Sequence, residues 1–124
     1  MIKKILVIDD EEIIIRSLSK LLEKNGYKVF VAKNGQDAIV MSEEEDFDLI
    51  LADIRMPGIN GVEAVERIYE MMPKKRIKRI PAIFITGYAD EINEKRAKNL
   101  DPIAYIYKPF DMGDLLDKIK KATG

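Results

Sequence analysis

The sequence contains no cysteine and no histidine. Without cysteine the chain has neither a disulfide nor a thiolate metal site. Without histidine it has no Ser-His-Asp triad, no HExxH zinc site and no imidazole that could donate a phosphoryl group. Any metal site in this chain must therefore be built from oxygen ligands.

Long apolar runs and a strong net charge are also missing. No apolar run approaches the roughly 20 residues of a membrane span, and the start of the chain does not read as a signal peptide. We therefore expect a cytoplasmic protein that does not insert into a membrane. The 21 basic and 22 acidic residues leave a formal charge of −1. No global field draws such a chain to nucleic acid, so we expect no direct nucleic-acid binding.

The composition that remains is that of an ordinary globular domain. Of the 124 residues, 47% are hydrophobic and 35% are charged. This length suits one domain, residues 1–124, with enough buried surface for a hydrophobic core.

Aliphatic runs alternate with helical patterns along the chain. Strands are predicted at residues 4–8, 27–32, 47–52, 81–85 and 103–107. Helices are predicted after the first strand, at 36–44, after the loop "MPGING", at about 89–99, and from Pro109 onward. Five strand–helix units of this kind predict an α/β fold with a doubly wound parallel sheet and helices on both faces.

Chemically useful side chains follow four of the five predicted strands. Asp9 and Asp10 follow the first strand, Asp53 the third, Thr86 the fourth and Lys108 the fifth. In open α/β sheets, ligands bind outside the carboxyl ends of the strands. If the first and third strands are neighbours, three carboxylates converge at this edge of the sheet.

Each of these residues also has a purely structural interpretation. The acids at 9–11 could cap the first helix, and Asp53 could be a turn residue. Thr86 could cap the fourth helix, and Lys108 could be a solvated charge beside the helix-starting Pro109. Individually these interpretations stay open, and for Thr86 and Lys108 they are favoured. The conjunction of all the residues at one sheet edge is harder to explain structurally.

Together the residues suit phosphoryl transfer to a carboxylate. Three carboxylates in a cleft repel one another unless a cation intervenes, and an all-oxygen site favours Mg²⁺. A carboxylate can act as a nucleophile and form an aspartyl phosphate. The Lys108 ammonium and the Thr86 hydroxyl could then contact phosphoryl oxygens. On this interpretation Asp9 and Asp10 hold a metal beside Asp53.

Four segments, "ILVIDDE", "LILADIRMPGINGVE", "IFITGYAD" and "AYIYKPFDMGDLL", resemble the receiver domain of bacterial response regulators, the CheY-like family. The resemblance covers essentially the whole chain. It implies a flavodoxin-like (βα)5 sheet with strand order 2-1-3-4-5 and a function in two-component phosphorelay signal transduction.

The resemblance also implies roles for the residues around the metal. Asp53 matches the phosphoacceptor of the family. Asp10 and Asp53 would ligate Mg²⁺ through their side chains, Arg55 through its backbone carbonyl and Asp9 mainly through water, with Mn²⁺ able to replace Mg²⁺. Lys108 would pair with the phosphoryl group.

Further positions match the family's conformational switch. Thr86 and Tyr105 match its switch pair, in which movement of Thr86 lets Tyr105 turn inward and remodels the face of the fourth helix, fifth strand and fifth helix. The peptide bond between Lys108 and Pro109 is expected to be cis.

The function implied is that of a phosphoacceptor signalling domain, and not of an enzyme that acts on other substrates. A histidine kinase or a histidine phosphotransfer protein would supply the phosphoryl group, and an output protein or domain would dock on the switched face. The alternative is a receiver-like interaction module that works without phosphorylation. A haloacid-dehalogenase phosphohydrolase is disfavoured because Arg55 stands where that family has a second aspartate.

Two features near the site are less ordinary. Arg55 and Tyr88 each lie two residues beyond a site residue, at positions that the family uses to tune phosphoryl lifetime. We predict that Arg55→Ala alters the dephosphorylation rate, because a guanidinium there could contact phosphate or obstruct water. The basic run "KKRIKR" at 74–79 lacks aromatic partners, so a solvated loop is favoured over a nucleic-acid contact.

Overall fold

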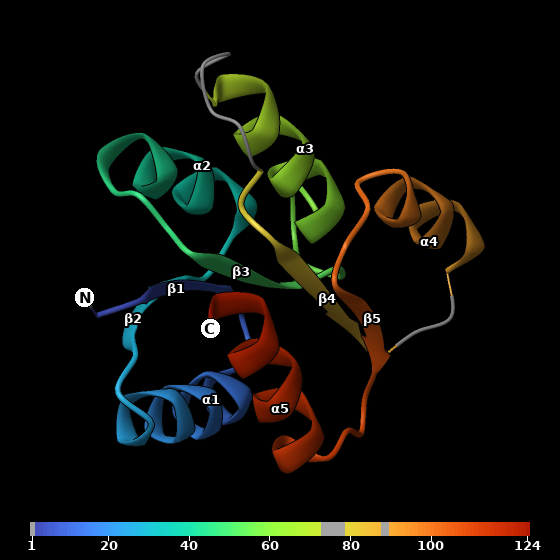
Figure 1. Ribbon diagram of the computed structural model, residues 1–124. Coiled ribbons are helices and arrows are strands. Elements are labelled where there is room, and N and C mark those ends of the chain that lie inside the picture. Colours follow the sequence, from blue (N-terminus) through green and yellow to red (C-terminus); the bar gives the residue numbers. More distant parts are fainter. Residues whose placement is uncertain (1, 73–78, 88–89) are drawn as a thin grey trace.

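A computed structural model describes residues 2–72, 79–87 and 90–124, which form an alternating series of strands and helices (Figure 1). The strands are β1 (Lys4–Ile8), β2 (Lys28–Ala32), β3 (Leu49–Asp53), β4 (Ala82–Thr86) and β5 (Ala104–Tyr107). The helices are α1 (Glu12–Lys24), α2 (Gly35–Glu44), α3 (Gly61–Met71), α4 (Glu91–Lys98) and α5 (Met112–Thr123). No helix in the described ranges combines the length and the apolarity needed to cross a membrane.

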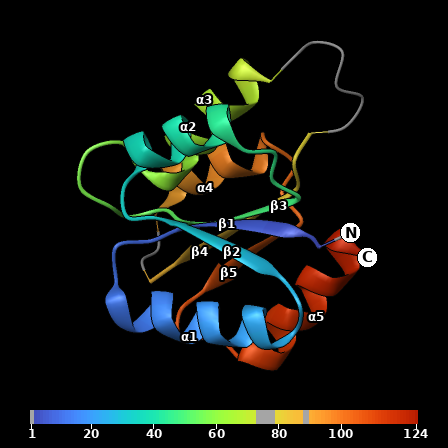
Figure 2. The ribbon, with the colours of Figure 1, turned by 90° about the vertical axis from the view of Figure 1, so that its left-hand side faces the viewer.

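The strands form one parallel sheet in the order β2-β1-β3-β4-β5, which confirms the predicted fold class. Helices α1 and α5 cover one face, and α2, α3 and α4 cover the other (Figure 2). The side chains of β1 divide between these two layers. Leu6 and Ile8 belong to the core under α2 and α3, whereas Ile5 and Val7 belong to the core under α1 and α5. A strand that is buried on both faces needs an aliphatic residue at every position, and β1 has one from Ile5 onward.

The predicted start of the last helix is wrong, whereas that of the fourth helix, at about residue 89, is within two residues of the observed start. The last helix begins at Met112 and not at Pro109, because the N-cap is Asp111, whose Oδ1 accepts the backbone N–H of Asp114 at 3.0 Å. The fourth helix begins at Glu91 after the N-cap Asp90. Thr86 is therefore the end of β4 and not the cap of the fourth helix.

The sheet register brings the predicted site residues to one edge. Asp53 lies beside Ile85 in the β3–β4 pair, and Thr86 lies beside Tyr107 in the β4–β5 pair. The backbone N–H of Lys108 continues this pairing by donating to the carbonyl of Thr86 at 2.7 Å. Polar side chains therefore gather at the carboxyl ends of four strands, β1, β3, β4 and β5.

Candidate functional site

Three carboxylates converge at the carboxyl end of the sheet. Asp9 and Asp10 follow β1, and Asp53 is the last residue of the neighbouring strand β3. Each can offer one oxygen such that the three oxygens lie within 4.8 Å of one another. Asp9 and Asp53 are buried, while Asp10 is exposed. The predicted acidic cluster is therefore present, with two buried carboxylates and one that is exposed to solvent.

Local backbone contacts fix the two buried carboxylates. Asp9 Oδ1 accepts the backbone N–H of Glu11 at 2.9 Å, which orients this side chain across the end of β1. Behind β3, the backbone of Gly61 donates to the carbonyl of Ile54 at 3.0 Å. A Cβ at position 61 would lie 2.1 Å from the carbonyl oxygen of Asp53. Only glycine permits this approach of α3 to the end of β3, so Gly61 contributes to the placement of Asp53.

Lys108 closes the cluster from the end of β5. Its Nζ lies 3.6 Å from Asp53 Oδ2 and 3.8 Å from Asp9 Oδ2, within ion-pair range but beyond hydrogen-bond range. The same Nζ donates to Glu11 Oε1 at 2.8 Å. The Lys108–Pro109 peptide bond is cis. The ammonium group therefore faces three carboxylates at once and is hydrogen-bonded to only one of them.

The Asp53 carboxyl is a weaker acid than an ordinary aspartate, because it is buried and lies next to Asp9. Burial, with the charge of Asp9, raises the pKa of Asp53 to about 6, against the opposing effects of Lys108 and of the Arg55 backbone N–H. Burial likewise raises the pKa of Asp9, although its hydrogen bond from Glu11 and the charge of Lys108 oppose the change. A cation between these groups would remove both the repulsion and the desolvation penalty.

The cluster fits a hard divalent cation. Asp9, Asp10 and Asp53 are oxygen donors of the kind that Mg²⁺ prefers, and the exposed side of Asp10 leaves room for the waters that Mg²⁺ retains. Arg55 was predicted to add its backbone carbonyl. It lies two residues after Asp53 on the segment that leaves β3, and its backbone N–H lowers the pKa of the Asp53 carboxyl by hydrogen bonding.

The predicted switch pair lies at the ends of β4 and β5. Thr86 is 1% exposed. Tyr105 lies beside Phe84 in the register, and its hydroxyl is buried without a hydrogen-bond partner among the described residues. Burial raises the pKa of Tyr105 to about 12, helped by Tyr107 and Glu94. Tyr105 is thus partly buried as a residue, but its hydroxyl lies out of contact with water, where a hydroxyl without a partner is costly.

Tyr107 connects β5 to α4 at the surface. Its ring contacts that of Tyr105, with the ring centroids 5.4 Å apart. Tyr107 is 46% exposed, and its hydroxyl donates to Glu94 Oε1 at 3.0 Å. It therefore ties the surface of α4 to the end of β5.

One site residue escaped the sequence reasoning. Glu11 was considered only as a helix cap, yet its side chain makes no capping bond and instead accepts from Lys108. The sequence feature that could have indicated Glu11 is its position as the third acid of "IDDEE", in the loop that already carries Asp9 and Asp10. Two other predictions lie outside the described residues: the role of Tyr88, and the basic run apart from Arg79.

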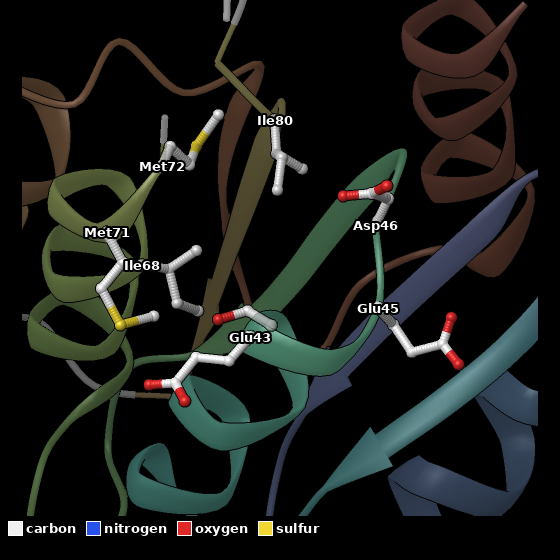
Figure 3. Close-up of a pocket in the computed structure, with 8 residues that line it drawn as sticks. Glu43, Glu45, Asp46, Ile68, Met71, Met72 and Ile80 are labelled. Carbon is white, nitrogen blue, oxygen red and sulfur yellow. The ribbon is translucent and has the colours of Figure 1, made fainter. Parts of the chain in front are cut away.

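A pocket of about 310 Å³ lies away from this cluster, near the amino ends of β3 and β4 (Figure 3). Its lining residues come from the end of α2, the following loop, the end of α3 and the segment just before β4: Ser42, Glu43, Glu45, Asp46, Ile68, Met71, Met72 and Ile80. Of its carboxylates, Glu45 is paired with Lys4 at 2.9 Å. The pocket contains none of the predicted site residues, so it contributes nothing to the chemistry at the opposite end of the sheet.

Comparison with known proteins places this geometry among signalling domains. Residues 5–120 match the family model described as "Response regulator receiver domain". The chain is 36% identical over 121 residues to the transcriptional regulatory protein CrdR of Helicobacter pylori, covering 98% of this chain and 55% of CrdR. It is 33% identical to the sporulation initiation phosphotransferase F of Bacillus subtilis, covering 98% of this chain and 94% of that protein.

The solved structures agree with the sequence matches. A CheY-like response regulator receiver domain protein from Methanospirillum hungatei superimposes with a TM-score of 0.87 at 36% identity, covering 98% of this chain and 93% of that one. The chain spans about half the length of two of the curated relatives it matches, with 55% of CrdR and 46% of the Bacillus subtilis transcriptional regulatory protein ResD.

Proposed function

The chain belongs to the response regulator receiver domain family, and from this premise we propose that Asp53 accepts a phosphoryl group from a phosphohistidine donor in a Mg²⁺-dependent reaction. The observation that carries the proposal is the placement of the buried Asp53 carboxyl between two further carboxylates and the Lys108 ammonium. A solvated turn aspartate would have neither the burial nor these neighbours.

In this proposal Asp9, Asp10 and Asp53 hold the cation, with the backbone carbonyl of Arg55 as a further ligand. When bound, Mg²⁺ supplies charge neutralisation for the phosphoryl oxygens and screens the three carboxylates from one another. Mn²⁺, which accepts the same oxygen ligands, is expected to substitute.

The remaining steps belong to side chains of the chain itself. An Asp53 carboxylate oxygen attacks phosphorus while the bond from phosphorus to the donor's imidazole nitrogen breaks, and the donor takes a proton as it leaves. The Lys108 ammonium, already within 3.6 Å of Asp53, is close enough to pair with the transferred group. Thr86, buried at the end of β4, would donate its hydroxyl to a phosphoryl oxygen.

The output is a change in the face built by α4, β5 and α5. Thr86 and Tyr105 connect the site to this face, because they lie on the adjacent strands β4 and β5. The proposed partners are a histidine kinase or histidine phosphotransfer protein as donor and an output protein or domain that docks on the α4-β5-α5 face. The chain acts as a phosphoacceptor, and the only reactions assigned to it are its own phosphorylation and dephosphorylation.

The test is intact mass after incubation with acetyl phosphate, with Mg²⁺ and with a chelator. The wild type should gain one phosphoryl group only when Mg²⁺ is present, and Asp53→Asn should gain none. Asp117→Asn, the same chemical change at an exposed position of α5, is the matched control and should be modified like the wild type.

Failure has a defined meaning. If the folded wild type gains no phosphoryl group and also fails to bind beryllofluoride, the phosphoacceptor function is wrong. The alternative, an interaction module that works without phosphorylation, would then take its place. Modification of Asp53→Asn to the wild-type extent would place the acceptor elsewhere.

A further inference from the structure

Glu11 occupies the N-cap position of α1 but does not behave as a cap. Its backbone conformation is extended, as expected for an N-cap, yet its side chain makes no capping hydrogen bond. The carboxylate instead reaches across the mouth of the site and accepts from Lys108 Nζ at 2.8 Å. This side chain is 56% exposed, so no packing forces it into that position.

The contact decides where the Lys108 ammonium rests. Of the three carboxylates that face Nζ, only Glu11 lies at hydrogen-bond distance, whereas Asp53 and Asp9 lie at 3.6 and 3.8 Å. The Lys108 side chain is 16% exposed, so this charge-assisted bond is partly desolvated on the lysine side and solvated on the Glu11 side. The ammonium is therefore held toward the rim of the site, closer to Glu11 than to the buried carboxylates of Asp53 and Asp9.

A group that arrives on Asp53 must share or take this ammonium. A phosphoryl group brings more negative charge to the site, and the Lys108 ammonium, 3.6 Å from Asp53 Oδ2, is then shared between that charge and Glu11. Any movement of Nζ toward the phosphoryl group and away from Glu11 lengthens the bond to Glu11. The charge of Glu11 also adds to the negative potential that an anionic phosphodonor must approach.

We propose that Glu11 is a positioning residue that holds Lys108 at the rim of the site and competes with the phosphoryl group for its ammonium. The proposal rests on the phosphoacceptor function proposed above and adds a device that slows phosphorylation of the resting protein. Glu11 touches no reacting atom. It acts through Lys108.

The test compares Glu11→Ala with Glu12→Ala in the full chain. Glu12 is the adjacent residue, also acidic and in the first turn of α1, but its carboxylate pairs with Lys33 at the surface. Both variants remove one charge near the same helix N-terminus, so the effect on the helix dipole is matched. Glu11→Gln is a third variant, which keeps an oxygen acceptor near Lys108 but removes the charge.

Two readouts are needed. The first is the rate at which an amine-specific reagent labels Lys108 in the resting protein, followed by peptide mass spectrometry, and it does not depend on phosphorylation. The second is the rate of phosphorylation by acetyl phosphate at saturating Mg²⁺, followed by intact mass. Glu11→Ala should label Lys108 about twofold faster or more and should be phosphorylated about three- to tenfold faster. Glu11→Gln should be intermediate, and Glu12→Ala should match the wild type.

Several results would overturn the proposal. If labelling of Lys108 is unchanged in Glu11→Ala, Glu11 does not hold the ammonium. If labelling rises but phosphorylation is unchanged or slower, Glu11 does not compete with the phosphoryl group. If Glu12→Ala has the same effect as Glu11→Ala, the effect comes from the loss of a negative charge near the N-terminus of α1 and not from the bond to Lys108. If the wild type is labelled normally but is never phosphorylated, the phosphoacceptor function itself is refuted. The proposed competition between Glu11 and the phosphoryl group is then refuted as well.

Discussion

Replacing Asp53 by asparagine should stabilise the fold at neutral pH when no divalent metal is present. The pKa of Asp53 is about 6 in the folded protein, against 3.8 for an unperturbed aspartate, because the carboxyl is buried and next to Asp9. Each pH unit between the two pKa values corresponds to about 1.4 kcal/mol. An ionised Asp53 should therefore lower the free energy of unfolding by about 3 kcal/mol, and an asparagine of nearly the same shape avoids this loss.

The gain should appear only within a defined pH window. Folded Asp53 keeps its proton up to about pH 6, whereas the unfolded chain releases it near 3.8, so the folded state binds more protons between these values. Stability from this group is therefore present at low pH and lost as the pH rises through the folded pKa. In urea unfolding followed by far-UV circular dichroism, the advantage of Asp53→Asn should grow from near zero at about pH 4 to about 3 kcal/mol at about pH 8.

Metal and a control variant make this prediction specific. Mg²⁺ that binds only the folded wild type stabilises it by mass action, so adding Mg²⁺ should shrink the difference between wild type and Asp53→Asn. Asp117→Asn, at an exposed position, should stay within about 0.5 kcal/mol of the wild type at each pH. Equal stability of Asp53→Asn and wild type at about pH 8 without metal, or a difference that does not vary with pH, would refute the reasoning.

Three other substitutions have defined outcomes. Gly61→Ala would bring a Cβ to 2.1 Å from the Asp53 carbonyl oxygen and should lower the free energy of unfolding by about 3 kcal/mol or more in urea unfolding. Gly87→Ala, whose Cβ would have its nearest atom at 3.9 Å, should lower it by less than about 1 kcal/mol. Similar losses in both variants would contradict the clash. Asn60→Ala removes the oxygen that accepts the Glu63 N–H at 2.9 Å and should cost about 1 kcal/mol in the same assay, so an unchanged unfolding midpoint would argue against this cap. Arg55→Ala should change the dephosphorylation rate in a phosphate-release assay, and an unchanged lifetime would end that idea.

Most of the fold could be predicted because its signals are local. Each predicted strand overlaps an observed one, since a strand buried on both faces leaves a continuous aliphatic run in the sequence. The strand order came from the family resemblance, because alternation alone does not specify which strands are neighbours. The start of the last helix was misplaced because Pro109 is favoured at a first helical position. The better signal was Asp111 three residues before Asp114, the spacing of an N-cap and the N–H that it accepts.

The convergence of Asp9, Asp10, Asp53 and Lys108 could be predicted from the sequence, but the part that Glu11 plays and the individual contacts could not. Strand-end residues could be named from the sequence, because the topology of a parallel sheet brings strand ends together. The role of Glu11 could not be, because Lys108 lies 97 residues away and the choice among three carboxylates depends on ångström-scale geometry. The buried hydroxyl of Tyr105 is a similar case, because alternation along a strand indicates a face and not the depth of a side chain.

The attachment of α4 explains how a small change at the site could reach a surface. Ala97 is the only buried side chain of α4, whereas α1 and α5 each bury three. Polar contacts hold α4 instead: Arg96 pairs with Glu66 of α3, and Tyr107 donates to Glu94. Displacing α4 therefore exposes little apolar surface and exchanges protein hydrogen bonds for bonds to water, which costs far less than opening the layer under α1 and α5. Of α1, α4 and α5, helix α4 is thus the one whose displacement should cost the least free energy.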